Sequence, residues 1–209
     1  MRVLLAGFGP FPGAPLNPSA AVAQALARRR RPALAELDRS VHVFATTYAA
    51  VDRDLPKLFA DKPDIVLIFG LAGRRRQMCI ETRARNALSL LFPDASGRRQ
   101  STGVIEAGGP DALFGRAPFQ RLLTAAGPHK TPVRLSRDAG RYLCNYVYWR
   151  ALQRAPHGSP LVQFVHIPPI AQPSRPARPR SKKSHAPALA HIVTAAENLL
   201  IALVAARKH

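Results

Sequence analysis

The sequence is poor in cysteine, with only Cys79 and Cys144 among 209 residues. It contains no CxxC pair and no group of cysteines and histidines at metal-ligand spacing. Neither a disulfide scaffold nor a zinc site is therefore indicated, and we expect no metal and no cofactor. Two thiols of this kind suit the reducing cytoplasm.

Long apolar runs are also missing. The segments 64–73 and 186–206 are too short or are interrupted by polar residues such as Glu197, whereas a membrane span needs ~18 or more apolar residues. The apolar stretch 3–6 is broken at once by glycine and proline, so it does not form the core of a signal peptide. We expect a soluble, cytoplasmic protein with no membrane segment.

Acidic residues are scarce, because 12 Asp and Glu stand against 31 Lys and Arg, a formal net charge of +19. The cations occur in blocks at 28–31, 74–76, 98–99 and 175–183. Such a surface attracts polyanions through counterion release. The interleaved aromatics and reading helix of a nucleic-acid-binding module are absent, so we interpret the blocks as a solvated surface that binds nucleic acid at most non-specifically.

Apolar strand patterns alternate with helical patterns along the chain. Strands are expected near 2–6, 41–45, 65–69, 133–135 and 161–166, and helices near 48–60, 120–125, 143–152 and 188–205. A further helix is expected from about 18 to the arginine cluster that begins at 28. The alternation predicts an α/β fold, a single-domain three-layer sandwich with helices on both faces of a twisted, mostly parallel sheet. At ~150 residues per domain, we expect one domain spanning 1–209, with a flexible basic arm at 171–186.

Cys144 follows capping residues and a glycine, and it stands at the start of a run in which Leu143, Val147 and Leu152 recur at helical spacing. The first amides of a helix carry unpaired N–H groups and a partial positive charge, which favour the thiolate that attacks carbonyls. Most cysteines are nevertheless small buried hydrophobes, so Cys144 needs partners.

Two residues could supply these partners. His166 ends an apolar run before two prolines, which predicts a strand that delivers it to the carboxyl edge of a sheet. Glu81 lies in a segment where strand geometry would put Arg83 and Arg85 on its own face. The ordinary alternatives are a satisfied histidine at a strand end and an exposed ion pair of Glu81 with an arginine.

The glycines of the loop 7–13 nearly reproduce a dinucleotide fingerprint, so a nucleotide-dependent enzyme is one alternative. The last glycine falls one residue late, and Pro10 and Pro12 remove amide donors that a phosphate cradle would use. A stiff loop carrying Phe8 and Phe11 suits a flat, apolar ligand better.

Several motifs follow one another in order: GFGPF at 7–11, NPS at 17–19, the glutamate segment 70–86, PD at 93–94, GGP at 108–110, AG with LCNYV between 139 and 147, and FVHIP at 164–168. In these motifs the chain resembles the pyrrolidone-carboxylate peptidases, also called pyroglutamyl peptidases I. The similarity runs to about residue 170, and its most specific parts surround Cys144 and His166.

The resemblance implies a cysteine exopeptidase that hydrolyses the N-terminal pyroglutamyl residue from peptides through a triad of Cys144, His166 and Glu81. In such a triad the thiol attacks, the imidazole moves the proton and the acid orients the imidazole. By analogy with bacterial relatives, a homo-oligomer such as a tetramer is expected.

Pyroglutamate is a flat, uncharged lactam, so its pocket needs apolar walls with one donor and one acceptor. By similarity to the family, Phe8 and Phe11 enclose the ring, Asn17 reaches its carbonyl, and the backbone at Leu71 reaches its N–H. The ordinary alternatives are core-filling phenylalanines and Asn17 as the cap of the first helix.

The sequence departs from the usual family pattern at Thr82, Arg83 and Arg85, and at Leu91, where an arginine is common. If that arginine helps to bind substrate or oxyanion in relatives, activity would be reduced or substrate preference altered. A catalytically weakened relative whose basic surface binds polyanions is therefore the alternative function.

Overall fold

The computed structural model describes residues 1–11, 13–127, 131–157, 159–171 and 186–208. Its main sheet has six strands in the order β2-β1-β3-β8-β4-β7, and a second sheet pairs β5 with β6. The strands are β1 (Arg2–Phe8), β2 (Asp38–Phe44), β3 (Ile65–Leu71), β4 (Met78–Glu81), β5 (Arg83–Arg85), β6 (Ala112–Phe114), β7 (Val133–Ser136) and β8 (Leu161–Ile167). The helices are α1 (Pro18–Ala27), α2 (Tyr48–Ala60), α3 (Phe119–Ala126), α4 (Leu143–Gln153) and α5 (Leu189–Lys208), with a 3-10 turn at Pro32–Leu34.

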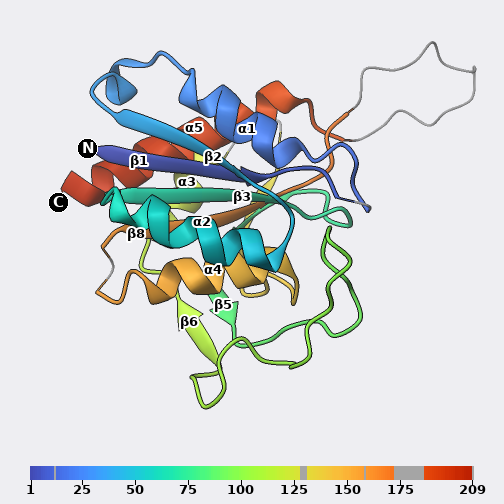
Figure 1. The fold of residues 1–209 in the computed structure, drawn as a ribbon. Coiled ribbons are helices and arrows are strands. Elements are labelled where there is room, and N and C mark those ends of the chain that lie inside the picture. Colours follow the sequence, from blue (N-terminus) through green and yellow to red (C-terminus); the bar gives the residue numbers. More distant parts are fainter. Residues whose placement is uncertain (12, 128–130, 158, 172–185, 209) are drawn as a thin grey trace, which may run out of the picture.

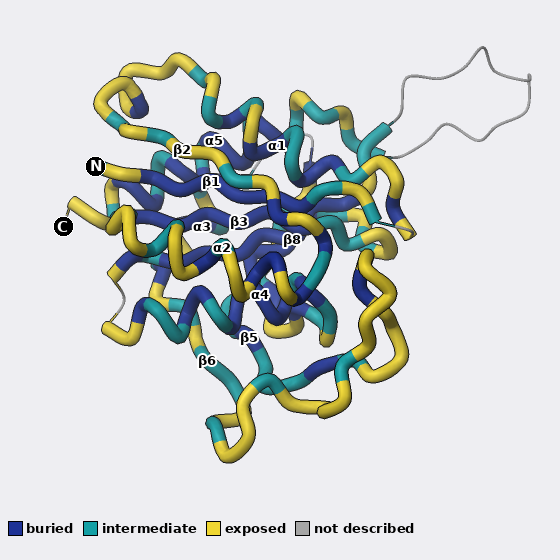
Figure 2. Tube along the Cα trace, viewed as in Figure 1, coloured by how far each residue is buried: buried dark blue, intermediate teal, exposed yellow. Residues whose placement is uncertain are grey.

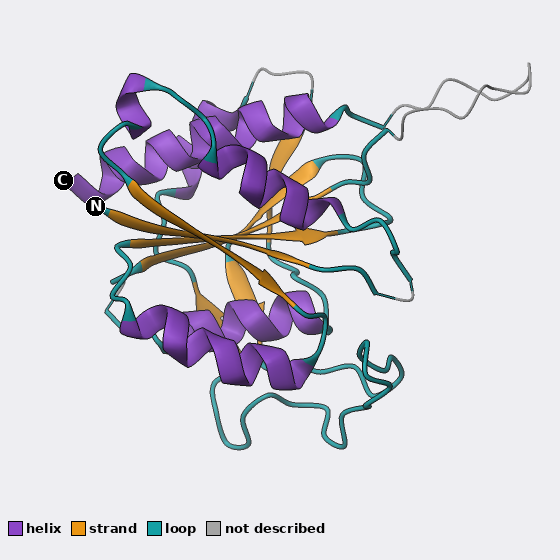
Figure 3. Cartoon of the chain, turned by 45° about the horizontal axis from the view of Figure 1, so that its top comes forward, coloured by secondary structure: helices purple, strands orange, loops and turns teal. Residues whose placement is uncertain are grey.

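The main sheet is mostly parallel. Strand β1 runs parallel to β2 and β3, β3 to β8, and β4 to β7, whereas β4 runs antiparallel to β8. Helices α1, α3 and α5 contribute to the apolar core on one face, and α2 and α4 to the core on the other (Figures 1 and 3). The predicted α/β sandwich of three layers is confirmed.

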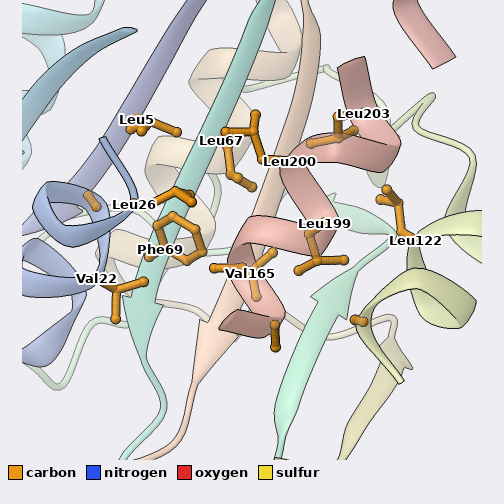
Figure 4. Close-up of a cluster of buried hydrophobic side chains, with 14 of the residues drawn as sticks. Leu5, Val22, Leu26, Leu67, Phe69, Leu122, Val165, Leu199, Leu200 and Leu203 are labelled. Carbon is orange, nitrogen blue, oxygen red and sulfur yellow. The ribbon is translucent and has the colours of Figure 1, made fainter. Parts of the chain in front are cut away.

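The central strands β1, β3 and β8 are buried along almost their whole length (Figure 2). Continuous apolar runs of this kind are typical of strands that are covered by helices on both faces. Figure 4 shows how α5 fits this pattern, because Leu199, Leu200 and Leu203 pack toward Leu67 and Val165 of the sheet.

Among the described residues, α5 is long and apolar enough to cross a membrane, and half of its apolar window is buried inside the protein. Core helices of soluble proteins have the same properties. Its packing on β3, β8 and α1 accounts for its composition.

Local sequence signals fix two helix starts. Asn17 caps α1, since its side chain accepts a hydrogen bond from Ser19 N at 3.2 Å and Pro18 takes the first helical position. Thr47 caps α2 by accepting from Ala50 N at 3.2 Å. The predicted range 48–60 for the second helix is the observed range of α2.

The segment around Glu81 differs from the expected continuous strand. The strand is interrupted at Thr82, whose N–H and hydroxyl both donate to Ser136 O, at 2.8 and 3.1 Å. Because β5 then leaves for the second sheet, Arg83 and Arg85 do not continue the face of Glu81. Strand β6 was not expected, and the predicted flexible arm falls largely on 172–185, outside the described residues.

Candidate active site

Three elements meet near the carboxyl end of β8. His166 lies near the end of β8, Glu81 ends β4, and Cys144 is in the first turn of α4. His166 Nδ1 is 2.7 Å from Glu81 Oε1. Cys144 Sγ packs over Gly70 of β3, and Gly70 is the residue that pairs with His166 in the adjoining strands. The fold brings the three predicted side chains together.

The antiparallel pairing of β4 with β8 explains how Glu81 reaches His166. In this register Glu81 lies opposite Phe164 and Cys79 lies opposite His166. Glu81 and His166 are therefore diagonal neighbours, a spacing that long side chains can bridge across adjacent strands.

Burial and charge set the protonation of this pair. Burial alone would lower the pKa of His166, but hydrogen bonding with Cys144 and Glu81 and the charges of both outweigh it and raise the pKa to about 9. Burial alone would raise the pKa of Glu81, but His166, with help from Ser136 and Arg75, lowers it below its ordinary value. Both shifts favour the charged forms, an imidazolium beside a carboxylate.

Arg75 is a further partner of Glu81. Its Nη1 donates to Glu81 Oε1 at 2.6 Å, the same oxygen that faces His166, and its Nη2 donates to Asp138 O at 2.5 Å. The exposed ion pair of Glu81 with Arg83 or Arg85 is not formed, since Glu81 is fully buried and pairs with His166 and Arg75. Arg75 is thus not part of the solvated surface expected for the block 74–76.

The backbone of Glu81 is held as firmly as its side chain. Its carbonyl accepts from the Tyr148 hydroxyl and from Gln163 Nε2, both at 3.0 Å. All of these groups are buried, so leaving any of them unpaired would be unfavourable. The acid is fixed before any ligand arrives.

Arg83 and Arg85 brace the loop that leads to Cys144. Arg83 Nε donates to Arg137 O at 3.0 Å, and Arg85 Nη2 donates to Asp138 Oδ1 at 2.6 Å. Two of the departures from the family pattern therefore have a structural role.

The same loop turns sharply into α4. Gly140 adopts φ +84°, in the region that favours glycine. Tyr142 precedes the helix, and no described side chain caps α4. The sequence predicted capping residues here, but Ser136 and Asp138 accept from loop amides, those of Asp138 and Gly140, at 3.2 and 3.0 Å. The first amides of the helix are therefore left available to a ligand.

A cavity of about 660 Å³ opens beside these side chains. Its described lining residues are Phe11, Gly13, Ala72, Gly73, Arg74, Arg75, Phe92, Pro93, Asp94, Gly140, Tyr142 and His166. The lining combines aromatic walls with a few polar groups, as small-molecule sites usually do.

The four predicted substrate contacts have different positions. Phe11 lines the cavity, whereas Phe8 is 2% exposed and packs against Phe44 with ring centroids 5.8 Å apart. Asn17 caps α1, and its Nδ2 donates to Gly9 O at 3.0 Å. Leu71 ends β3 next to the lining residue Ala72. Of these four residues, only Phe11 is among the described lining residues.

Sequence reasoning assigned no site role to Arg75, Phe92, Asp94 or Tyr142. Tyr142 donates from its hydroxyl to Pro93 O at 2.9 Å, so two walls of the cavity support each other. Asp94 accepts from the amides of Tyr48, Ser96 and Arg98 at 2.9 to 3.1 Å, which anchors its loop to the start of α2. The available signals were the Pro-Asp motif, which contains Asp94, and the glutamate segment 70–86, which contains Arg75.

Gly70 is expected to be intolerant of any side chain. An added Cβ would lie 2.6 Å from Phe164 Cζ and 2.8 Å from Cys144 Sγ, so the ring or the sulfur would have to move. A displacement of ~1 Å at a reacting atom lowers rates about 10²-fold. We expect Gly70→Ala to lower kcat/KM by about that factor, measured by steady-state kinetics.

The matched control is Gly103→Ala, because a Cβ at Gly103 meets no described atom within 4 Å. Equal activity of both variants would show that Cys144 does not need the space above Gly70. Thermal unfolding of the variants separates a displaced thiol from a lost fold.

A thiol, an imidazole and a buried carboxylate beside an apolar cavity, on an α/β sandwich, define a cysteine-type hydrolase. The family model described as pyroglutamyl peptidase matches residues 1–209. The chain belongs to this family, which confirms the resemblance seen in its motifs.

Relatives and solved structures agree. The chain is 32% identical over 175 residues to the pyrrolidone-carboxylate peptidase of Pyrococcus furiosus, covering 82% of this chain and 83% of the relative. It is 30% identical over 174 residues to that of Bacillus subtilis, covering 82% and 80%. The pyrrolidone carboxyl peptidase from Thermococcus litoralis superposes with a TM-score of 0.84 at 26% identity, covering 99% of this chain and 95% of that one. Bacillus amyloliquefaciens pyroglutamyl peptidase I gives 0.78 at 28%, covering 100% and 97%.

Proposed function

We propose that the enzyme removes N-terminal pyroglutamyl residues from peptides by using Cys144 as nucleophile, His166 as acid and base, and Glu81 as the group that orients the imidazole. The observation that carries this proposal is the contact of 2.7 Å between His166 Nδ1 and Glu81 Oε1. It fixes the ring so that Nε2 is the nitrogen that remains for Cys144.

The reaction proceeds in two steps. The Cys144 thiolate attacks the carbonyl carbon that joins the pyroglutamyl residue to the rest of the peptide. The peptide C–N bond breaks, the lactam ring stays closed, and the His166 imidazolium gives its proton to the leaving amine. Water then attacks the thioester and loses a proton to His166 while the C–S bond breaks. Pyroglutamic acid leaves, and the thiolate and imidazolium are restored. The raised pKa of His166, about 9, supports a protonated acid at neutral pH.

The oxyanion of each step needs donors beside Cys144. Helix α4 begins at Leu143 without a side-chain cap among the described residues. Its first amides therefore lack an intrahelical partner and carry partial positive charge. We assign the oxyanion to this helix start, where such donors stabilise developing charge.

The lactam would occupy the cavity of about 660 Å³. Phe11, Phe92 and Tyr142 offer flat apolar surfaces for the uncharged ring. Contacts of Asn17 and the Leu71 backbone with the ring remain proposals. Asn17 would have to exchange its present hydrogen bonds with Gly9 and Ser19 in order to reach the lactam carbonyl.

Turnover of a pyroglutamyl aminocoumarin by the purified chain is the direct test. We expect kcat/KM for this reporter to exceed that for the prolyl and glutaminyl reporters by about 10²-fold or more. The first of these lacks the ring carbonyl and the second lacks the ring, so each leaves polar groups of the pocket unpaired. Equal turnover of all three would contradict lactam recognition. Absence of turnover, with salt-dependent retention on DNA, would favour the weakened, polyanion-binding alternative.

We also propose a homo-oligomer and a cytoplasmic location. Assembly is inferred by family analogy. Both cysteines are free thiols, which suits a reducing compartment. We also propose that residues 1–209 form one domain.

A further inference from the structure

Arg74 is a cation at the mouth of the cavity, and it has no counterion among the described residues. It lines the cavity together with His166 and Phe11, and its side chain is exposed. No ion pair to Arg74 occurs within the described residues. All 12 acidic residues of the sequence lie in the described part of the chain. No Asp or Glu side chain therefore neutralises Arg74.

The other charged groups at the cavity already have partners. Arg75 binds Glu81 and Asp138 O. Asp94, the one carboxylate among the described lining residues, accepts from the amides of Tyr48, Ser96 and Arg98. Arg74 is thus the charged lining side chain that is left to a ligand.

The positive region extends beyond the main cavity. A second cavity of about 290 Å³ shares Gly73, Arg74 and Arg75 with the first and adds Arg76. With a net charge of +19, the protein also attracts anions over a longer range. A guanidinium is well suited to binding a carboxylate through two parallel hydrogen bonds.

The chemistry of the proposed substrate indicates where such a carboxylate would come from. A pyroglutamyl residue carries no charge and blocks the N-terminus, so the first charges of the peptide lie beyond the scissile bond. They are an acidic side chain of the next residue or, in a dipeptide, the C-terminal carboxylate. When the lactam fills the apolar part of the cavity, the departing residues leave through its mouth.

We infer that Arg74 selects pyroglutamyl peptides that carry a carboxylate directly after the scissile bond. This inference rests on the proposed function and adds a preferred substrate class to it. Arg74 acts in specificity and takes no part in bond making or proton transfer.

Two matched pairs of peptides test the inference on the full chain. One pair is pyroglutamyl-glutamic acid amide and pyroglutamyl-glutamine amide, and the other is pyroglutamyl-alanine and its amide. The readout is the ratio of kcat/KM between the charged and the neutral member of each pair. We expect the ratio to be about two- to five-fold at low salt, as partly exposed ion pairs allow. The ratio should approach one in about 0.5 M NaCl, where charges are screened. The pair that shows the preference identifies the source of the carboxylate.

Two charge reversals separate a local contact from the general field. In Arg74→Glu the ratio should fall to one or below, and Arg74→Lys should retain most of it. Arg121→Glu changes the net charge equally, but Arg121 lies on α3 and is not a described lining residue of the cavity, so its ratio should stay that of the wild type. A ratio near one in the wild type, or an equal drop in both reversals, would overturn the inference while leaving the proposed function intact. If no peptide is turned over, both fall together.

Discussion

Cys144→Ser is expected to lower kcat/KM for the pyroglutamyl reporter by at least about 10⁴-fold, because a hydroxyl beside His166 is a far weaker nucleophile than a thiolate. The side chain keeps its size and still fits over Gly70. We therefore expect the variant to fold and to bind the lactam. Steady-state kinetics with thermal unfolding as a check measures this effect.

Cys79→Ser is the matched control for that experiment. Cys79 is fully buried on β4, and its sulfur accepts a hydrogen bond from Arg134 Nε at 3.4 Å. A serine oxygen can accept the same bond, so most activity should remain. Comparable losses in the two variants would mean that Cys144 is not the nucleophile. Alkylation by iodoacetamide should inactivate the wild type and the Cys79 variant alike.

Glu81→Gln is expected to lower kcat/KM by about 10²–10⁴-fold and to move its pH profile. The carboxylate of Glu81 helps to raise the pKa of His166 to about 9, so the wild type should lose activity as pH rises through 9 and the imidazolium loses its proton. Without the carboxylate the imidazolium is less stable. The upper limb of the profile should therefore shift to lower pH, which kcat/KM measured between pH 6 and 10 would record.

Glu36→Gln makes the same chemical change at an exposed position and should leave both the rate and the upper limb unchanged. If Glu81→Gln reduced activity with no shift of the limb, Glu81 would have a structural role only. Such a result would remove Glu81 from the triad and leave the thiol and imidazole in place.

The layers of the fold followed from the sequence because continuous apolar runs such as 65–69 indicate buried parallel strands. Helix α2 has its predicted range, and in the structure Thr47 supplies a cap at its start. The break at Thr82 could not be predicted, since it depends on hydrogen bonds to Ser136, which is remote in sequence. Strand β6 was missed for a different reason, because a strand of three residues carries little periodicity of its own.

The candidate site shows the same division. Cys144, His166 and Glu81 stand in motifs that a single sequence can reveal. Arg75 stands in a run of arginines. Nothing in the local sequence shows that Arg75, and not its solvated neighbours in the run, binds Glu81. Phe8 and Phe11 were assigned one role from similarity, yet burial separates them, because Phe8 is inside β1 and Phe11 lies in the loop beyond it.

The anchoring of Asp94 at the start of α2 bears on how the cavity meets its ligand. The carboxylate satisfies the Tyr48 amide at the helix start and, at the same time, holds the turn next to Phe92 and Pro93. This wall of the cavity is therefore ordered during folding. The hydrogen bond between Asp94 and the first amide of α2 offsets the conformational entropy that the wall loses. A ligand that binds in the cavity, such as the proposed lactam, would meet a preorganised wall and would spend little of its binding free energy on ordering it.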